Sequence, residues 1–154
     1  MRAGWMMLAC FLTLGLILEA MHGFKVRWYL DAVNETRRLM LRLAHAHGAL
    51  LGVVNILFAI TAQHIGRGAP WQGKISPLLL TGSLLLPAGF LLGGVVVYGG
   101  DPGIGVLLVP IGAAMLIIAV AVTAWYSSTP AGAPGESSSA EDKRLRRKGR
   151  GGSA

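Results

Sequence analysis

The chain of 154 residues is 53% hydrophobic and only 14% charged, whereas soluble domains carry about 25% charged residues. This composition excludes an ordinary soluble domain and indicates a membrane protein. The net charge of +7 does not predict nucleic acid as a partner, because six of the fourteen Lys and Arg residues lie in one short C-terminal segment, KRLRRKGR. The single cysteine, Cys10, excludes a disulfide framework.

Four apolar runs follow one another along the chain, each close to the roughly 20 residues that a helix needs to cross the hydrocarbon core. They cover residues 5–21, 44–62, 77–98 and 104–126. Every Trp and Tyr lies at or just outside an end of a run, as expected of side chains that favour the headgroup level. The sequence therefore predicts an all-α membrane protein, a four-helix transmembrane bundle over residues 1–126.

The first run is predicted to be a retained span rather than a signal peptide, because Leu18 and Glu19 stand where a cleavage site needs small residues. Residues 127–154 contain one large apolar residue, Leu145, which predicts a disordered basic tail. With four spans, nine basic residues lie on the side of the two termini and five on the other side. The positive-inside rule then predicts cytoplasmic termini, in a bacterial inner membrane.

Four titratable residues are predicted to lie near one face of the membrane. Glu19 and His22 end the first span, His45 opens the second, and Asp101 lies between the third and the fourth. A carboxylate close to hydrocarbon is costly unless it is paired. We therefore predict a structural polar cluster in which Glu19 is paired and holds the first two helices together. The candidate partners of Glu19 are His45, Arg38 and Arg42.

The HAHG segment of the second span places His45 and His47 about 200° apart around a regular helix. We predict that His45 faces the bundle and that His47 faces lipid or the headgroup layer, so the two cannot bind one ion. Small residues allow helices to approach closely in lipid, and an Asn can bond across such an interface. The predicted helix-packing positions are Gly48, Gly52, Asn55, Gly89 and Gly93.

Two other functions stay open at this point. His22 and His45 could ligate a haem or, together with Glu19 and Asp101, a divalent metal ion, which would make the protein a redox accessory factor. Glu19 could instead couple protons in a small transporter or channel. The sequence contains no nucleophile elbow, Walker loop, dinucleotide fingerprint or zinc-binding cysteine set. The leading expectation is a structural or accessory protein that is no enzyme and has no cofactor.

The order of several segments resembles a small four-span family of bacterial membrane proteins of unknown function, with an Ala/Gly-His-Gly signature after the first helix. The segments are EAMHGFK, RLAHAHGALLGV, LLLTGSLLLPAGFLLGG and GVLLVPIGAAMLIIA. The resemblance implies the four-helix architecture and supplies no mechanism. It carries over His22, Gly23, His45, Gly82, Ser83, Pro110 and Gly112. Independently of it, the expected partners are the lipid bilayer and either other membrane proteins or a second copy of the chain.

Overall fold

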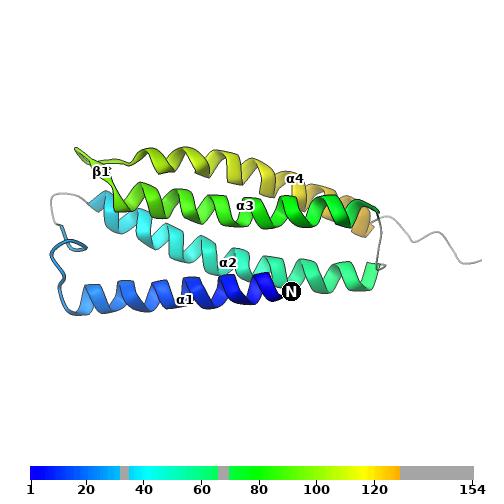
Figure 1. The fold of residues 1–154 in the computed structure, drawn as a ribbon, viewed down its shortest axis with the longest axis horizontal. Helices are drawn as coiled ribbons and strands as arrows, with labels where there is room; N and C mark the ends of the chain where they lie inside the picture. Colours follow the sequence, from blue (N-terminus) through cyan, green and yellow to red (C-terminus); the bar gives the residue numbers. More distant parts are fainter. Residues whose placement is uncertain (32–34, 66–69, 129–154) are drawn as a thin grey trace, which may run out of the picture.

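Four long helices make up most of the computed structural model, which describes residues 1–31, 35–65 and 70–128. They form an elongated bundle in which each helix runs antiparallel to the one before it (Figure 1). The helices are α1 (Arg2–Gly23), α2 (Glu35–Ile65), α3 (Pro70–Val95) and α4 (Leu108–Ser128). All four are long and apolar enough to cross a membrane. The predicted fold class, an all-α membrane protein with a four-helix bundle, is confirmed.

The helices are longer than the apolar runs that predicted them. α2 begins at Glu35, well before the predicted start at Ala44, and α4 continues through Ser127 and Ser128, which had been assigned to the tail. Hydropathy marks the part of a helix that lies in hydrocarbon, but backbone hydrogen bonding continues into the headgroup layer. The rest of the predicted tail, residues 129–154, lies outside the described residues.

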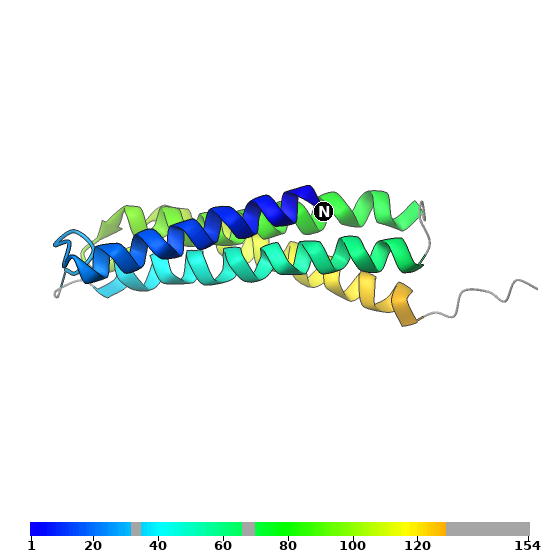
Figure 2. The ribbon, with the colours of Figure 1, turned by 90° about the horizontal axis from the view of Figure 1, so that it is seen from below.

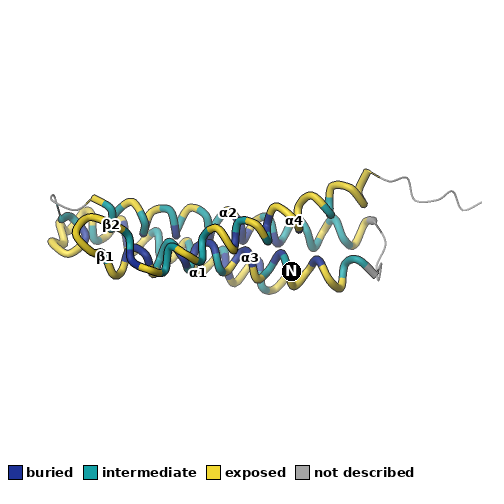
Figure 3. The backbone as a smooth tube through the Cα atoms, turned by 90° about the horizontal axis from the view of Figure 1, so that it is seen from above, coloured by how far each residue is buried: buried dark blue, intermediate teal, exposed yellow. Residues whose placement is uncertain are grey.

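The helices pack in chain order, with α1 against α2, α2 against α3 and α3 against α4. The main core combines Met7 of α1, Leu51 of α2, Leu79 of α3 and Leu116 of α4. Buried positions follow the inside of the bundle along its length, and the outside is exposed (Figure 3). This outer surface carries many large apolar side chains, such as Ile117, which is 69% exposed. An apolar exterior is what a bilayer requires.

α1 is shifted along the bundle relative to the other helices. Its first turn lies short of the end that α2, α3 and α4 reach (Figures 1 and 2). In agreement, Gly4 packs beside Ile56 of α2, more than two turns before α2 ends at Ile65. The shift fixes which residues of α1 and α2 lie at the same depth.

The connection after α1 is packed inward. Lys25 adopts a left-handed conformation (φ 52°) that ends the helix, and the Val26 amide donates to the Met21 carbonyl oxygen at 2.9 Å. Tyr29 is 2% exposed and packs with Leu18 and Leu41. This tyrosine, just outside a span end, therefore packs in the interior of the protein rather than presenting an exposed ring to the headgroups.

The connection between α3 and α4 projects from the bundle instead. Strands β1 (Val97–Tyr98) and β2 (Asp101–Pro102) form a short antiparallel hairpin, and the 3₁₀ helix η1 (Ile104–Leu107) leads into α4. The hairpin turn uses Gly99 and Gly100, both with positive φ, a conformation that glycine adopts without a steric penalty.

Candidate functional site

The interface between α1 and α2 combines close backbone contact at Gly4 and Gly52 with two aromatic rings that lie over glycines. The ring of His45 on α2 lies directly over Gly15 of α1, and the ring of Phe11 on α1 lies over Gly48 of α2. A side chain at either glycine would overlap the ring above it. Nδ1 of His45 is 2.6 Å from the backbone oxygen of Phe11. Because a carbonyl oxygen only accepts, Nδ1 carries the hydrogen of this bond. The prediction that His45 faces the bundle is confirmed.

A second polar contact joins α2 to α3. Nδ2 of Asn55 donates to Oγ of Ser83 at 2.7 Å and to the carbonyl oxygen of Leu51 at 2.8 Å. Asn55 is 9% exposed and Ser83 is fully buried, so both groups depend on these bonds for their hydrogen-bonding partners. The predicted interhelical bond of Asn55 is thus present, and its partner is on α3, whereas Gly48 and Gly52 face α1.

α3 and α4 meet through backbone rather than through side-chain rings. A Cβ atom on Gly112 would lie 2.7 Å from the Leu86 amide nitrogen, and one on Gly82 would lie 3.0 Å from the Gly112 oxygen. Gly89 lies close to the backbone of Val109, whereas Gly93 is only in ordinary contact with Val106. Of the two predicted packing glycines of α3, Gly89 therefore faces the start of α4, and Gly93 faces the 3₁₀ helix η1.

His47 does not face lipid, contrary to the prediction. Its ring lies 5.1 Å from the ring of Phe90 on α3, centroid to centroid. Nδ1 of His47 bonds to the Leu43 oxygen of its own helix at 2.9 Å. The prediction failed because the face of α2 that includes Leu51 packs against α3. α2 is thus covered on two sides, by α1 and by α3, so a residue that points away from α1 need not face lipid.

The predicted polar cluster is not assembled. His45 bonds to Phe11, and Arg38 pairs with Glu35 at 2.6 Å. Glu19 is exposed and forms no ion pair with His45, with Arg38 or with any other residue that the structure describes. The predicted pairing of Glu19 with His45 is therefore absent, because Gly15, one turn earlier, occupies the position opposite the imidazole.

His22 and Asp101 are also apart from His45. His22 is exposed in the last turn of α1, seven residues beyond Gly15 and hence roughly 10 Å farther along the helix axis than the imidazole of His45. Asp101 is exposed in the hairpin beyond the helices. No group of three or more His, Cys, Asp and Glu side chains that could hold a metal ion occurs in the described ranges.

A contact that the sequence did not reveal lies at the same end of the bundle. The guanidinium of Arg37 stacks on the ring of Trp28 at 4.7 Å, and Nη1 donates to the Trp28 oxygen at 3.0 Å. Oγ1 of Thr36 donates to the Gly100 oxygen at 2.5 Å. Together these contacts tie the start of α2 to both connections. The sequence analysis did not anticipate these contacts, because the partner of Thr36 lies 64 residues away in the chain and that of Arg37 lies in the preceding connection.

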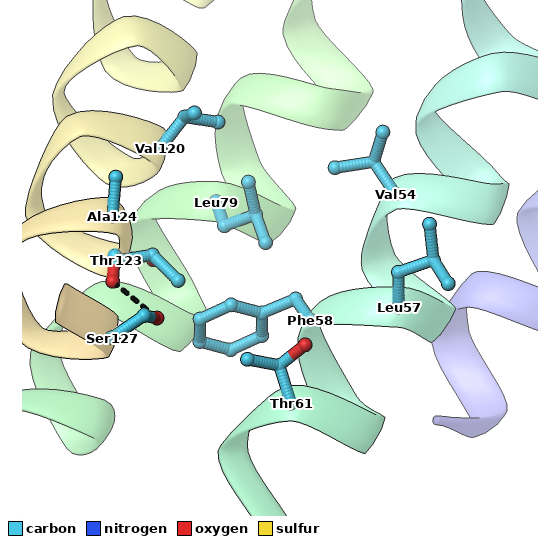
Figure 4. A pocket seen from close by; sticks show the side chains of 9 residues that line it. All are labelled: Val54, Leu57, Phe58, Thr61, Leu79, Val120, Thr123, Ala124 and Ser127. Carbon is cyan, nitrogen blue, oxygen red and sulfur yellow. Dashed lines mark hydrogen bonds between the residues drawn. The ribbon is translucent and has the colours of Figure 1, made fainter. Parts of the chain in front are cut away.

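A groove of about 260 Å³ opens between α2 and α4 on one side of α3 (Figure 4). Its walls are largely aliphatic, with Phe58 and Leu79 toward the inside. The hydroxyls of Thr123 and Ser127 donate to carbonyl oxygens of their own helix, at 2.7 Å in both cases. None of the four residues of the predicted cluster lines this groove. Its surface is therefore suited to hydrocarbon rather than to a polar solute.

Comparison of the chain with protein-family models, with curated proteins and with solved structures gave no match. The geometry is therefore the basis for any statement about function. Within the described bundle, the half-buried His45 and the buried Asn55 of α2 bond to neighbouring helices, whereas the half-buried His47 bonds to its own helix.

Proposed function

We propose that the protein is a small integral membrane protein with a structural or accessory, non-catalytic role. The observation that carries this proposal is the use of His45: its ring fills the space over Gly15 and its Nδ1 bonds to the Phe11 backbone. In the same way, the hydrogen bond from Asn55 to Ser83 links α2 to α3. Polar groups of this kind specify which helix faces pack together in lipid.

The two alternative functions have less support. A haem with two axial histidines needs both imidazoles at one depth, but His22 lies well beyond His45 along the bundle. A proton-coupled transporter that uses Glu19 would place this carboxylate on a path between helices, whereas Glu19 is exposed on the outside of α1. We therefore favour the structural role over a redox or transport role.

We also propose a bacterial inner-membrane location with cytoplasmic termini, and membership of the four-span family that the sequence resembles. The excess of basic residues on the terminal side supports the orientation. Four of the residues carried over from the family occupy interhelical contacts, which supports membership. They are His45, Gly82, Ser83 and Gly112.

The structural role is tested by purifying the full chain in a mild detergent. We expect a protein without a Soret band and without stoichiometric metal by elemental analysis. His45→Ala should lower the unfolding temperature and leave the absorption spectrum unchanged. The matched control is His22→Ala, which should leave both unchanged, because His22 is exposed. A Soret band or bound metal that is lost in His45→Ala would overturn the proposal in favour of a cofactor role.

The orientation is tested separately, by fusing to the C-terminus a reporter that is active only in the cytoplasm. Activity is expected. A periplasmic reporter that is active at the same position would contradict the proposed orientation and leave the structural role intact.

A further inference from the structure

Glu19 and Arg42 are opposite charges on neighbouring helices, and neither is paired with a residue that the structure describes. Both are exposed, Glu19 on α1 and Arg42 on α2. Among the described residues, neither side chain has a hydrogen-bond or ion-pair partner. An ionisable side chain on a transmembrane helix is costly unless it is paired or reaches water.

The two residues lie at the same depth. Gly15 packs against His45, and Gly52 packs against Leu8, which sets the antiparallel alignment of α1 with α2. One turn beyond Gly15 is Glu19, and one turn before His45 is Leu41. Arg42 adjoins Leu41 and is therefore level with Glu19, within about the 1.5 Å rise of one residue.

They also lie on the same side of the α1–α2 pair. At 100° per residue, Glu19 is on the side of α1 that carries Leu12, opposite the side on which Leu14 and Ile17 line a cavity with Leu91 of α3. Arg42 lies about 60° around α2 from His45, away from the α3-facing Asn55. Both charges thus face away from α3.

This layer lies at one edge of the hydrocarbon. The stacked rings of Trp71 and Tyr126 mark the opposite headgroup layer. From Tyr126, a span of about 20 residues back along α4 and η1 reaches the level of Gly105. Gly105 packs against Gly93, and the neighbouring Gly94 packs against Leu41. Glu19 and Arg42 are thus in a partly dry layer, where an opposite charge stabilises each of them.

We propose that the α1–α2 face binds a second copy of this chain. A two-fold axis along the membrane normal keeps every residue at its depth and makes the contact reciprocal. Glu19 of each protomer then meets Arg42 of its partner, so one contact supplies both ion pairs. A different protein would need complementary charges at the same depth, whereas a second copy supplies them by symmetry.

The rest of this face suits such a contact. Leu12 and Leu16 of α1 are 53% and 71% exposed, and Val53 of α2 is 39% exposed. Ala46, one turn from Arg42, is exposed as well, and small residues let helices of two protomers approach closely. Apolar packing would supply the contact area, and the two ion pairs would set its register.

The test uses charge reversal and mixing of full-length variants in liposomes. Donor and acceptor dyes are attached at a cysteine introduced at Ser153 in a Cys10→Ser background, and energy transfer is followed as the lipid-to-protein ratio rises. Wild type should show transfer. Glu19→Arg places like charges opposite Arg42 of its partner, and Arg42→Glu does the same opposite Glu19. Each variant alone should associate at least about tenfold more weakly.

The decisive sample is the mixture of the two variants. Glu19→Arg has two positive charges and Arg42→Glu has two negative charges, so a mixed dimer regains both ion pairs. We expect transfer between the two variants close to that of wild type. An ion pair within one protomer, or lipid headgroups bound to each charge, predicts no such recovery and would overturn the proposal. Wild type that behaves as a monomer, or single variants that associate as wild type does, would also overturn it.

Two further variants keep the test interpretable. Asp101→Lys reverses an exposed charge at the same end of the bundle but outside the face, and should associate as wild type does. If a charge-reversed chain does not fold, as judged by its helical circular dichroism, Glu19→Gln and Arg42→Gln replace it. Each then removes the attraction without adding repulsion and must still weaken association, or the proposal fails.

Discussion

Both helix pairs use glycine for close backbone contact, which Gly4 and Gly52 provide in the N-terminal pair, but the N-terminal pair also places aromatic rings over glycines. Between α1 and α2, Gly15 and Gly48 each lie beneath a ring of the other helix, His45 or Phe11. Between α3 and α4, Gly82 and Gly112 bring the two backbones together. A ring over a glycine fixes the register by shape and by the bond to Phe11, whereas backbone contact fixes mainly the distance between helices. Glycines on transmembrane helices thus serve two separate purposes in one small bundle.

The segments that connect the two helices within each pair also differ, in how deeply they are buried. The segment between α1 and α2 places Tyr29 in the interior, where it is 2% exposed. The hairpin between α3 and α4 leaves Tyr98 67% exposed. The first connection contributes to the core, and the second serves mainly to reverse the chain.

The largest expected effect is therefore that of Tyr29→Ala. Truncating a buried aromatic side chain removes its packing against Leu18 and Leu41 and should lower the free energy of unfolding by about 3 kcal/mol. The matched change Tyr98→Ala should alter it by less than about 0.5 kcal/mol, as for other exposed positions. Unfolding in detergent, followed by circular dichroism, compares the two. Equal losses would contradict the difference between the two connections.

The backbone contact of the second pair predicts the next largest effect. In Gly112→Val the new Cβ would lie 2.7 Å from the Leu86 amide nitrogen, which cannot move aside as a side-chain end can. We expect a loss of about 1–3 kcal/mol from overpacking. Gly73→Val is the control, because nothing lies within 4 Å of a Cβ there. Stability equal to wild type in Gly112→Val would show that α3 and α4 are not held at backbone contact.

The first pair predicts a rescue that the second pair cannot give. Gly15→Ala should destabilise the bundle by about 1–3 kcal/mol, since the added methyl group overlaps the His45 ring. In a His45→Ala background the ring is gone, and the same change should instead stabilise by up to about 1 kcal/mol through helix propensity. Unfolding of the four proteins of this cycle gives the coupling energy. Additive effects would show that the ring does not lie over Gly15 in the membrane.

Much of the fold could be predicted from the sequence. Twenty-residue apolar runs and aromatic residues near their ends define four spans, because bilayer thickness constrains length directly. Helix periodicity also placed His45 inward correctly. It could not place His47, because periodicity separates two faces of α2 but does not say that both are covered by other helices.

The polar cluster could not be predicted in the same way. Topology brings Glu19, His22 and His45 to one end of the bundle, but the offset of α1 along α2 depends on which side chains fit over which glycines. That offset places Gly15, rather than Glu19, opposite His45. A shift of about one turn, roughly 5.4 Å, is therefore enough to convert an expected ion pair into an imidazole bonded to backbone. Hydropathy and charge counts carry no information on such a shift.

The smallest expected effect on stability is that of the hydrogen bond that joins the N-terminal pair of helices to the C-terminal pair. Asn55 of α2 donates to Ser83 of α3 at 2.7 Å, and interhelical side-chain bonds in membranes average about 0.6 kcal/mol, with a maximum of about 1.7. A double-mutant cycle of Asn55→Ala and Ser83→Ala should give a coupling free energy in this range. Thr81→Ala, on an exposed position of the same helix, should show no coupling to Asn55→Ala. The value is expected to be small because Nδ2 keeps its bond to the Leu51 oxygen when Ser83 is truncated. Coupling well above 2 kcal/mol would mean that the contact between the pairs, rather than the ring packing within the first pair, is the main polar determinant of the fold.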